Sequence, residues 1–517
     1  MDALTAVLAI LVAIAILFEV ARRIGLPYPT LFVLGGLGLA FVPGLPRLRL
    51  EPDLVLLVFL PPLLFTAAVE TPIRELRTYL APITRLALGL VLVTMATVAA
   101  ALHAAIGVDW PVAFTLGAIV APTDAIAATS VFRRLGTPRI AATLIEGESL
   151  FNDATALVAY RAAVLAVASG SFLLQDALGT FVVAAAGGIA LGLVVGWASG
   201  ALLRRLDDPP VEVLISLVVP FAAYLPADRL GMSGVLAAVA AGLVIGSRLG
   251  TILGPNSRVL WLSVWKMVGF VLNGFVFVLV GLELPEIVGG LDGRAPIEVL
   301  SLCALVGAVV VVTRLIWVFG ASLLPDSPRR TVARTDPALA RQLTFIVGWA
   351  GLRGAVSLAA ALALPTGFPE RSLIVVLTFG VILVTLVGQG LTLPLIVRRT
   401  ADGAAIDGDE ATRARAAAYR AGLDAIARGR AEWSDHQPLF DRLESGLRDR
   451  TRHLATADPD ETAERRQERL EHEQIQQAVI AAQRSAVIDM RDRREINDQT
   501  LRSIERELDL EEIRMEG

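Results

Sequence analysis

The strongest constraint on the fold is a series of long apolar stretches between residue 1 and about residue 397. Stretches of roughly 18–28 residues recur, and short polar segments separate them. A helix needs about 20 apolar residues to cross a bilayer, and one soluble core could not bury a dozen such stretches. Only 19% of the residues are charged, against about 25% in soluble domains. The pattern therefore predicts an all-α polytopic membrane protein.

About thirteen transmembrane helices are expected from this pattern, or twelve if the short, glycine-rich range 29–44 is not a separate crossing. Their ranges are 3–21, 29–44, 53–69, 86–106, 111–131, 142–168, 176–203, 211–227, 231–247, 259–283, 296–324, 340–364 and 372–397. The transmembrane domain is thus assigned to residues 1–399. Residues 400–517 are rich in Ala, Arg and Glu and are predicted to form a helical tail, with a break near 456–460. The tail is interpreted as a regulatory or dimer-supporting domain, the alternative being solvated helices that only aid folding.

Basic residues in the short loops predict the orientation. With the N-terminus outside, the loops that would face the cytoplasm carry about 17 arginines and the opposite loops about 5. The tail is then cytoplasmic, and the protein is a multi-pass protein of the cell (inner) membrane. The first apolar stretch is interpreted as a helix and not a signal peptide, because it has no basic n-region and ends at Arg22 and Arg23.

Several function classes are excluded by what the chain lacks. Lys266 is the only lysine, and no phosphate-binding glycine loop precedes it, so an ATP-driven pump would need a second subunit. Cys303 is the only cysteine, so no intramolecular disulfide is possible. Three of the four histidines lie in the tail, and His103 falls at a predicted helix end, so no histidine metal site is expected in the membrane. No cofactor and no nucleic acid is expected.

Polar residues at membrane depth are costly and are functional by default. They concentrate in the fifth span (AIVAPTDAIAATS), the sixth (LIEGESLFNDATALVAYR) and the twelfth (FIVGWAGLRGAVSLA). In the sixth, Glu146, Ser149, Asn152 and Asp153 share one helix face, because they are spaced i, i+3, i+6 and i+7. Carboxylate, hydroxyl and amide oxygens suit a small hard cation such as Na⁺, and a carboxylate also binds H⁺. The alternative is a polar seam that only holds helices together.

Glu148 lies on another face of the sixth span and needs a cationic partner to stay charged there. Arg353, the only arginine well inside the twelfth span, is predicted to be that partner.

The fifth and twelfth spans each carry a helix-breaking element near the middle. Pro122 lies in the fifth, and Gly348, Gly351 and Gly354 lie in the twelfth. Broken helices at matching positions of two halves indicate an inverted-repeat transporter with its site at the breaks. The separation of seven spans fits two six-helix repeats joined by a linker helix, the seventh. A simple proline kink is the alternative for either span alone.

Taken together, APTD, EGESLFND and GLRGAVSLA resemble the signatures of NhaP/NHE-type sodium/proton antiporters, on the Asn-Asp branch of the monovalent cation:proton antiporters. The resemblance covers residues 1 to about 397, and the ending REINDQTLRSIERELDLEE is similar to that of bacterial members. It implies an elevator-type homodimer, with core helices 4–6 and 11–13, dimer helices 1–3 and 8–10, and helix 7 as linker.

The resemblance also implies roles for single residues. Asp153 would be the shared ion and proton carboxylate, and the preceding Asn152 would mark one-for-one, electroneutral exchange. Thr123, Asp124 and Ser149 would line the site, with Na⁺ held at Asp153, Ser149 and Thr123. Glu148 and Arg353 would form a structural ion pair.

Two positions depart from the family pattern. Thr66 stands where bacterial members often carry an acid after LPPLLF, and Lys266 follows a tryptophan where an acid is expected. Lys266 is expected to reach the cytoplasmic interface. Glu283, near the outer end of the tenth span, is either an entrance charge or a plain interfacial residue.

The expected function is therefore antiport of Na⁺ or Li⁺ against H⁺, with monovalent cations, protons, membrane lipids and a second copy as partners. K⁺/H⁺ antiport on the same fold, or a channel or non-transporting sensor, are the alternatives. An intramembrane hydrolase built on Ser149 is disfavoured because no histidine or lysine base lies nearby in the sequence, so the chain is not expected to be an enzyme.

Overall fold

The computed structural model describes residues 2–24, 26–42, 57–135, 137–169, 174–289, 294–324, 327–333, 336–365, 367–398, 405–433, 436–455 and 479–490, with residues 493, 495, 504 and 508. Every regular element in these ranges is a helix, which confirms the all-α prediction. The chain divides into two compact units, Met1–Ala404 and Ala405–Gly517, where the sequence predicts a boundary at residues 399 and 400.

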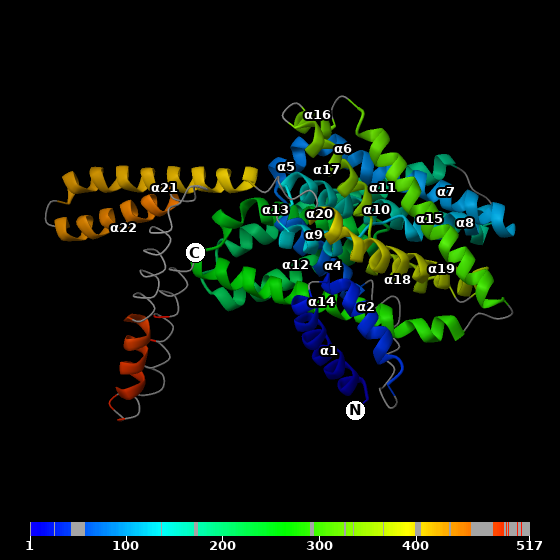
Figure 1. Ribbon diagram of the computed structural model, residues 1–517, viewed down its shortest axis with the longest axis horizontal. Helices are drawn as coiled ribbons and strands as arrows, with labels where there is room; N and C mark the ends of the chain where they lie inside the picture. Colours follow the sequence, from blue (N-terminus) through cyan, green and yellow to red (C-terminus); the bar gives the residue numbers. More distant parts are fainter. Residues whose placement is uncertain are drawn as a thin grey trace. The chain divides into compact units, whose positions relative to one another are not determined.

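The helices of the first unit follow the apolar stretches (Figure 1). They are α1 (Asp2–Ile24), α2 (Tyr28–Leu39), α4 (Leu60–Glu70), α5 (Ile73–Thr78), α6 (Leu80–Thr84), the π-helix η1 (Arg85–Leu90), α7 (Val91–Ile106), α8 (Trp110–Val120), α9 (Ala125–Leu135), α10 (Arg139–Ser169), α11 (Leu174–Leu203), α12 (Pro209–Arg229), α13 (Gly234–Ile252), α14 (Pro255–Gly289), α15 (Pro296–Ala321), α16 (Pro328–Ala333), α17 (Pro337–Trp349), α18 (Ala355–Leu362), α19 (Arg371–Leu383), the π-helix η2 (Val384–Gln389) and α20 (Gly390–Arg398).

Ten continuous helical segments in the described ranges are long and apolar enough to cross a membrane, and α2 and α4 are shorter apolar helices. Each of the thirteen predicted ranges contains helix. The count of thirteen crossings and the two inverted repeats stay predictions.

Two groups of helices pack around the polar residues. On one side α2 packs against α14, and α4 and α12 pack against α13. On the other, α8 packs against α7 and α10, and α15 packs against α7 and α19. Glycines allow the close contacts: a Cβ on Gly36 of α2 would lie 2.9 Å from the carbonyl carbon of Val278 on α14. The division into core and dimer helices stays a prediction.

In the second unit, α21 (Ala405–Glu432) and α22 (Gln437–Ala455) pack side by side (Figure 1). Arg430 ties them together, donating to Asp441 and Glu444 at 2.6 Å each. The predicted break at 456–460 and most of the ending at 494–512 lie outside the described residues.

Candidate functional site

Two interrupted helices meet at the centre of the first unit. The fifth predicted span is α8 and α9, separated by the non-helical residues 121–124, and the twelfth is α17 and α18, separated by 350–354. The two breaks touch, because the Asp124 backbone N–H donates to the Leu352 carbonyl at 2.7 Å. The Arg353 guanidinium donates to the Ala121 carbonyl. The predicted interruption of both helices is confirmed.

Two glycines of the second break make room for charged side chains. A Cβ on Gly354 would lie 2.8 Å from both Cβ and Cγ of Asp124, and a Cβ on Gly351 would lie 2.6 Å from Nε of Arg314. Real Cβ atoms do not approach this closely. The glycines of GLRG are therefore required by close approach of neighbouring side chains, besides weakening the helix.

Thr123 in the first break is held by α10. Its hydroxyl accepts a hydrogen bond from the Asn152 amide at 2.7 Å and donates to a Glu148 carboxylate oxygen at 3.1 Å. The Ser149 hydroxyl donates to the Thr123 carbonyl at 2.9 Å. Asn152 is 1% and Thr123 3% exposed. This network fixes the unwound backbone of residues 121–124 against the polar face of α10.

The predicted ion pair between Glu148 and Arg353 is wrong. Glu148 pairs with Arg314 of α15, whose two terminal nitrogens lie 2.5 and 2.9 Å from the two carboxylate oxygens. Both side chains are almost fully buried. Arg353 instead braces the first break through Ala121, and its backbone N–H donates to Thr385 of η2 at 3.1 Å. The two terminal nitrogens of Arg314 satisfy both oxygens of Glu148, so a bidentate pair forms without Arg353.

Arg314 is the residue that sequence reasoning missed. A signal was present: it is a lone arginine within an otherwise apolar stretch, VVVVTRLIWVFG. An ionisable residue at that depth requires a partner.

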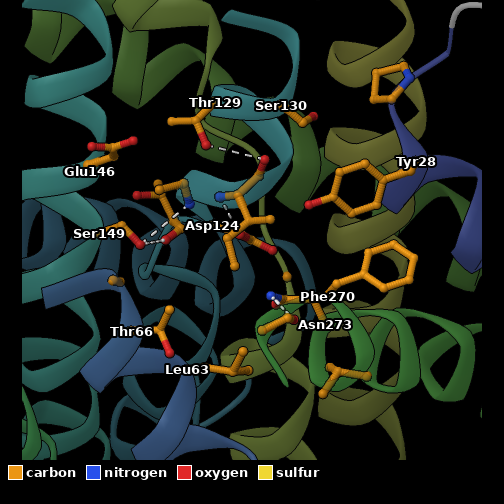
Figure 2. Close-up of a pocket in the computed structure, with 18 of the residues that line it drawn as sticks. Tyr28, Leu63, Thr66, Asp124, Thr129, Ser130, Glu146, Ser149, Phe270 and Asn273 are labelled. Atoms are coloured by element: carbon orange, nitrogen blue, oxygen red, sulfur yellow. Dashed lines mark hydrogen bonds between the residues drawn. The ribbon is translucent and has the colours of Figure 1, made fainter. Parts of the chain in front are cut away.

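A cavity of about 670 Å³ lies between the two groups of helices. Asp153 (6% exposed), Asp124, Thr123 and Ser149 line it, and so does Glu146. Figure 2 shows Asp124, Ser149 and Glu146 around this pocket, with Thr66 of α4 and Asn273 of α14 also at its wall. The cavity therefore brings together four of the five predicted ion-binding side chains. Asn152, the fifth, is not among the lining residues. Its amide donates a hydrogen bond to the Thr123 hydroxyl and so helps to position Thr123.

The two positions that depart from the family pattern also face this cavity. Thr66 lines it while its hydroxyl donates to the Pro62 carbonyl at 2.7 Å. Lys266 lines it too, together with Arg22 and Arg398. Glu283 lies on α14 outside the lining residues.

Glu148 and Asp124 have different bonding partners. Glu148 is neutralised by Arg314. One oxygen of Asp124 accepts the Ile126 N–H at 2.9 Å, at the start of α9. Buried carboxylates beside hydroxyl and carbonyl oxygens form an environment that can hold a proton or a small hard cation. A bundle of apolar helices with such a site between two helix breaks defines a polytopic ion transporter.

Comparison with known proteins gives the family. The model of the sodium/hydrogen exchanger transmembrane family matches residues 7–399. The low-affinity Na⁺/H⁺ antiporter NhaS1 of Synechocystis is 36% identical over 76% of this chain and 73% of its own length. A sodium, potassium, lithium and rubidium/H⁺ antiporter of Bacillus subtilis is 35% identical over 77% of this chain and 62% of its own length.

Among solved structures, the sodium proton antiporter MjNhaP1 of Methanocaldococcus jannaschii matches with a TM-score of 0.61 at 20% sequence identity. The match covers 78% of this chain and all of that one, and it shows a shared fold. The chain belongs to the sodium/hydrogen exchanger family. Members of this family are secondary transporters of Na⁺ and H⁺, not enzymes, and they need no cofactor.

Proposed function

We propose that this protein exchanges Na⁺ or Li⁺ for H⁺ across the cell membrane, with Asp153 as the carboxylate that binds either ion in turn. The observation that carries the proposal is the position of Asp153. It lies one turn of α10 beyond Ser149 and lines the same cavity as Asp124 of the first break and Gly354 of the second.

Glu148 and Asp124, the other acids at the crossing, are already engaged. Both oxygens of Glu148 bind Arg314, so releasing this acid for transport would leave a buried arginine unpaired. Asp124 is tied to the first turn of α9 through Ile126. Asp153 carries neither constraint, which makes it the acid best suited to alternate between a cation and a proton.

The ligands we propose for Na⁺ are Asp153, Ser149 and Thr123, with Asp124 beside them. Oxygen ligands suit a hard, weakly polarising cation. Asn152 would position Thr123 through its 2.7 Å hydrogen bond. Competition of one Na⁺ and one H⁺ for a single carboxylate moves no net charge, so the exchange is electroneutral.

The cavity's position between two helix groups supports an elevator cycle. In an elevator mechanism, the group containing α8–α10 and α17–α20 carries the loaded site past the group containing α2, α4, α13 and α14. The second group would also form a homodimer, with the N-terminus outside and the tail in the cytoplasm.

The direct test is dequenching of a pH-sensitive dye in proteoliposomes, with Na⁺, Li⁺ or K⁺ added in turn. Na⁺ and Li⁺ are expected to dequench the dye in the wild-type protein. The Asp153→Asn variant should give no signal, because an amide cannot exchange a proton. Asp109→Asn is the matched control, since Asp109 is an exposed acid at the start of α8.

Full cation-dependent proton movement in the Asp153→Asn variant would exclude Asp153 as the carrier. An initial rate that changes when a membrane potential is imposed would exclude electroneutral exchange. Current at equal pH on both sides would favour a channel, and no response to any cation would favour a sensor.

K⁺/H⁺ exchange is the second candidate, and Thr66 is the observation that favours it. A threonine at the cavity wall supplies a neutral oxygen where an acid would add a negative charge, which weakens the binding of a small cation most. The Bacillus relative is named as accepting K⁺ as well as Na⁺. A larger response to K⁺ than to Na⁺ in the same assay would favour K⁺/H⁺ exchange.

A further inference from the structure

A second cavity, of about 250 Å³, lies between α11 and α13 at their C-terminal ends. Its lining residues are Gly196, Trp197, Gly200, Ala201, Arg204, Arg205, Val244, Arg248 and Ile252. None of them lines the ion cavity.

Glycines explain why the two helices separate at this end. A Cβ on Gly192 would lie 2.8 Å from Cα of Ala237, and a Cβ on Gly196 would lie 2.9 Å from Cα of Ala241. One turn later, a Cβ on Gly200 would meet only the Ile252 side chain, at 3.2 Å. The backbones are therefore in close contact up to Gly196 and diverge after it, leaving a wedge at the helix ends.

Three guanidinium groups surround this wedge. Arg204, Arg205 and Arg248 are exposed, and none of their guanidinium groups makes a hydrogen bond or ion pair to a residue that the structure describes. The nearby Asp208 carboxylate accepts the Val211 N–H at the start of α12. Three guanidinium groups around one cavity, without partners among the described residues, match a phosphate group, which they can bind through paired N–H···O bonds.

The surface that leads into the wedge is apolar. Val183, Val194 and Trp197 of α11 are each at least 60% exposed. At about 100° per residue they fall on one side of the helix, the side that continues to Arg204 and Arg205. A tryptophan next to basic residues at the end of a spanning helix is typical of the bilayer interface.

We propose that this wedge binds the phosphate of an anionic phospholipid, with the acyl chains along the exposed stripe of α11. Free inorganic phosphate shares the headgroup chemistry but would leave the apolar stripe unused. The site is separate from the ion cavity, so it holds whether the exchanged cation is Na⁺ or K⁺.

The test measures lipid binding to the purified full-length protein by native mass spectrometry, with phosphatidylglycerol and phosphatidylcholine as probes. The variant is Arg204→Gln/Arg205→Gln/Arg248→Gln. We expect its affinity for phosphatidylglycerol to fall by at least about tenfold, since three charge-assisted contacts are lost. Binding of phosphatidylcholine should change little.

The matched control is Arg74→Gln/Arg77→Gln/Arg330→Gln, which removes three exposed arginines elsewhere in the same unit and makes the same change in net charge. It should bind phosphatidylglycerol as the wild type does. Equal losses in both variants would overturn the proposal, because the effect would then be one of net charge alone. Wild-type binding in the wedge variant would also overturn it.

Two further measurements distinguish a folding defect from a loss of lipid binding, and a bound lipid from bound inorganic phosphate. The melting temperature in phosphatidylcholine should be unchanged in the wedge variant, whereas the increase that phosphatidylglycerol gives the wild type should be lost. If inorganic phosphate alone displaces the lipid and raises the melting temperature as much, the wedge is a small-anion site and the lipid assignment fails.

Discussion

Gly354 shows how one missing methyl group shapes the ion site. It lies against the Asp124 side chain, which in turn begins α9 by accepting the Ile126 N–H. Gly354→Ala should displace Asp124 and lower the exchange rate by at least about tenfold, the effect of roughly 1.4 kcal/mol on a barrier. The rate is measured by dye dequenching in proteoliposomes.

Gly388→Ala is the control for that change, because a Cβ on Gly388 meets no atom within 4 Å. It should exchange at the wild-type rate. If Gly354→Ala also exchanges at the wild-type rate, the present position of Asp124 is not required for transport.

The charge balance at Glu148 can be tested through its partner. Arg314→Met should lower the free energy of unfolding by about 3–5 kcal/mol, because it leaves a buried carboxylate without its cationic partner. Adding Glu148→Gln should restore part of this loss, since the uncompensated charge is removed. Equilibrium unfolding in mixed micelles measures both changes.

The same cycle with Arg353→Met in place of Arg314→Met separates the two arginines. Residues in direct contact couple by about 0.5–3 kcal/mol. Coupling of Glu148 to Arg353 that equals or exceeds its coupling to Arg314 would contradict the pairing described here.

Part of the ion site could be predicted from the sequence alone. Ser149, Asn152 and Asp153 follow from helix spacing within one segment, and Thr123 and Asp124 from the adjoining break. The partner of Glu148 does not follow from spacing, because it depends on which of two distant spans packs beside α10. Arg314 is 166 residues away from Glu148, and only the tertiary packing selects it over Arg353.

At the scale of helices, local sequence predicted both interruptions. Pro122 has no backbone N–H to donate, and the glycines of the twelfth span favour an opening of the helix. The contact between the breaks, Asp124 to Leu352, was not predictable as a specific hydrogen bond. The turns of π-helix at η1 and η2 were not predicted from the sequence.

A salt bridge between helices should report on their relative movement. Arg161 of α10 donates to Asp228 of α12 at 2.7 Å, and both side chains are about half exposed. A pair of this kind contributes about 0.2–1 kcal/mol. If α10 moves past α12 in each cycle, Asp228→Asn should raise turnover by about 1.4- to 5-fold, because the conformation described here loses that stabilisation.

The charge-swapped Arg161→Asp/Asp228→Arg protein should return to the wild-type rate. Arg229→Gln, on the same exposed end of α12, should leave the rate unchanged. Unchanged turnover in Asp228→Asn would mean that these two helices do not separate in the rate-limiting step.

At the scale of the whole molecule, the two units are expected to have different roles. Every hydrogen bond described at the crossing of the breaks joins residues between Ala121 and Thr385, so the first unit contains the site. The second unit has its own contacts, with Phe440 of α22 against Gly429 of α21. A protein ending at Ala404 should therefore fold and still exchange a cation for a proton in proteoliposomes.

Comparing the truncated and full-length proteins also tests the two readings of the tail. If the tail is regulatory, the pH dependence of exchange should shift while the maximal rate stays within about twofold of the wild type. If it supports a dimer, light scattering after size-exclusion chromatography should show a smaller particle. A folded, truncated protein that exchanges no cation at any pH would contradict the assignment of the whole ion site to the first unit, because part of the site would then have to come from residues 405–517.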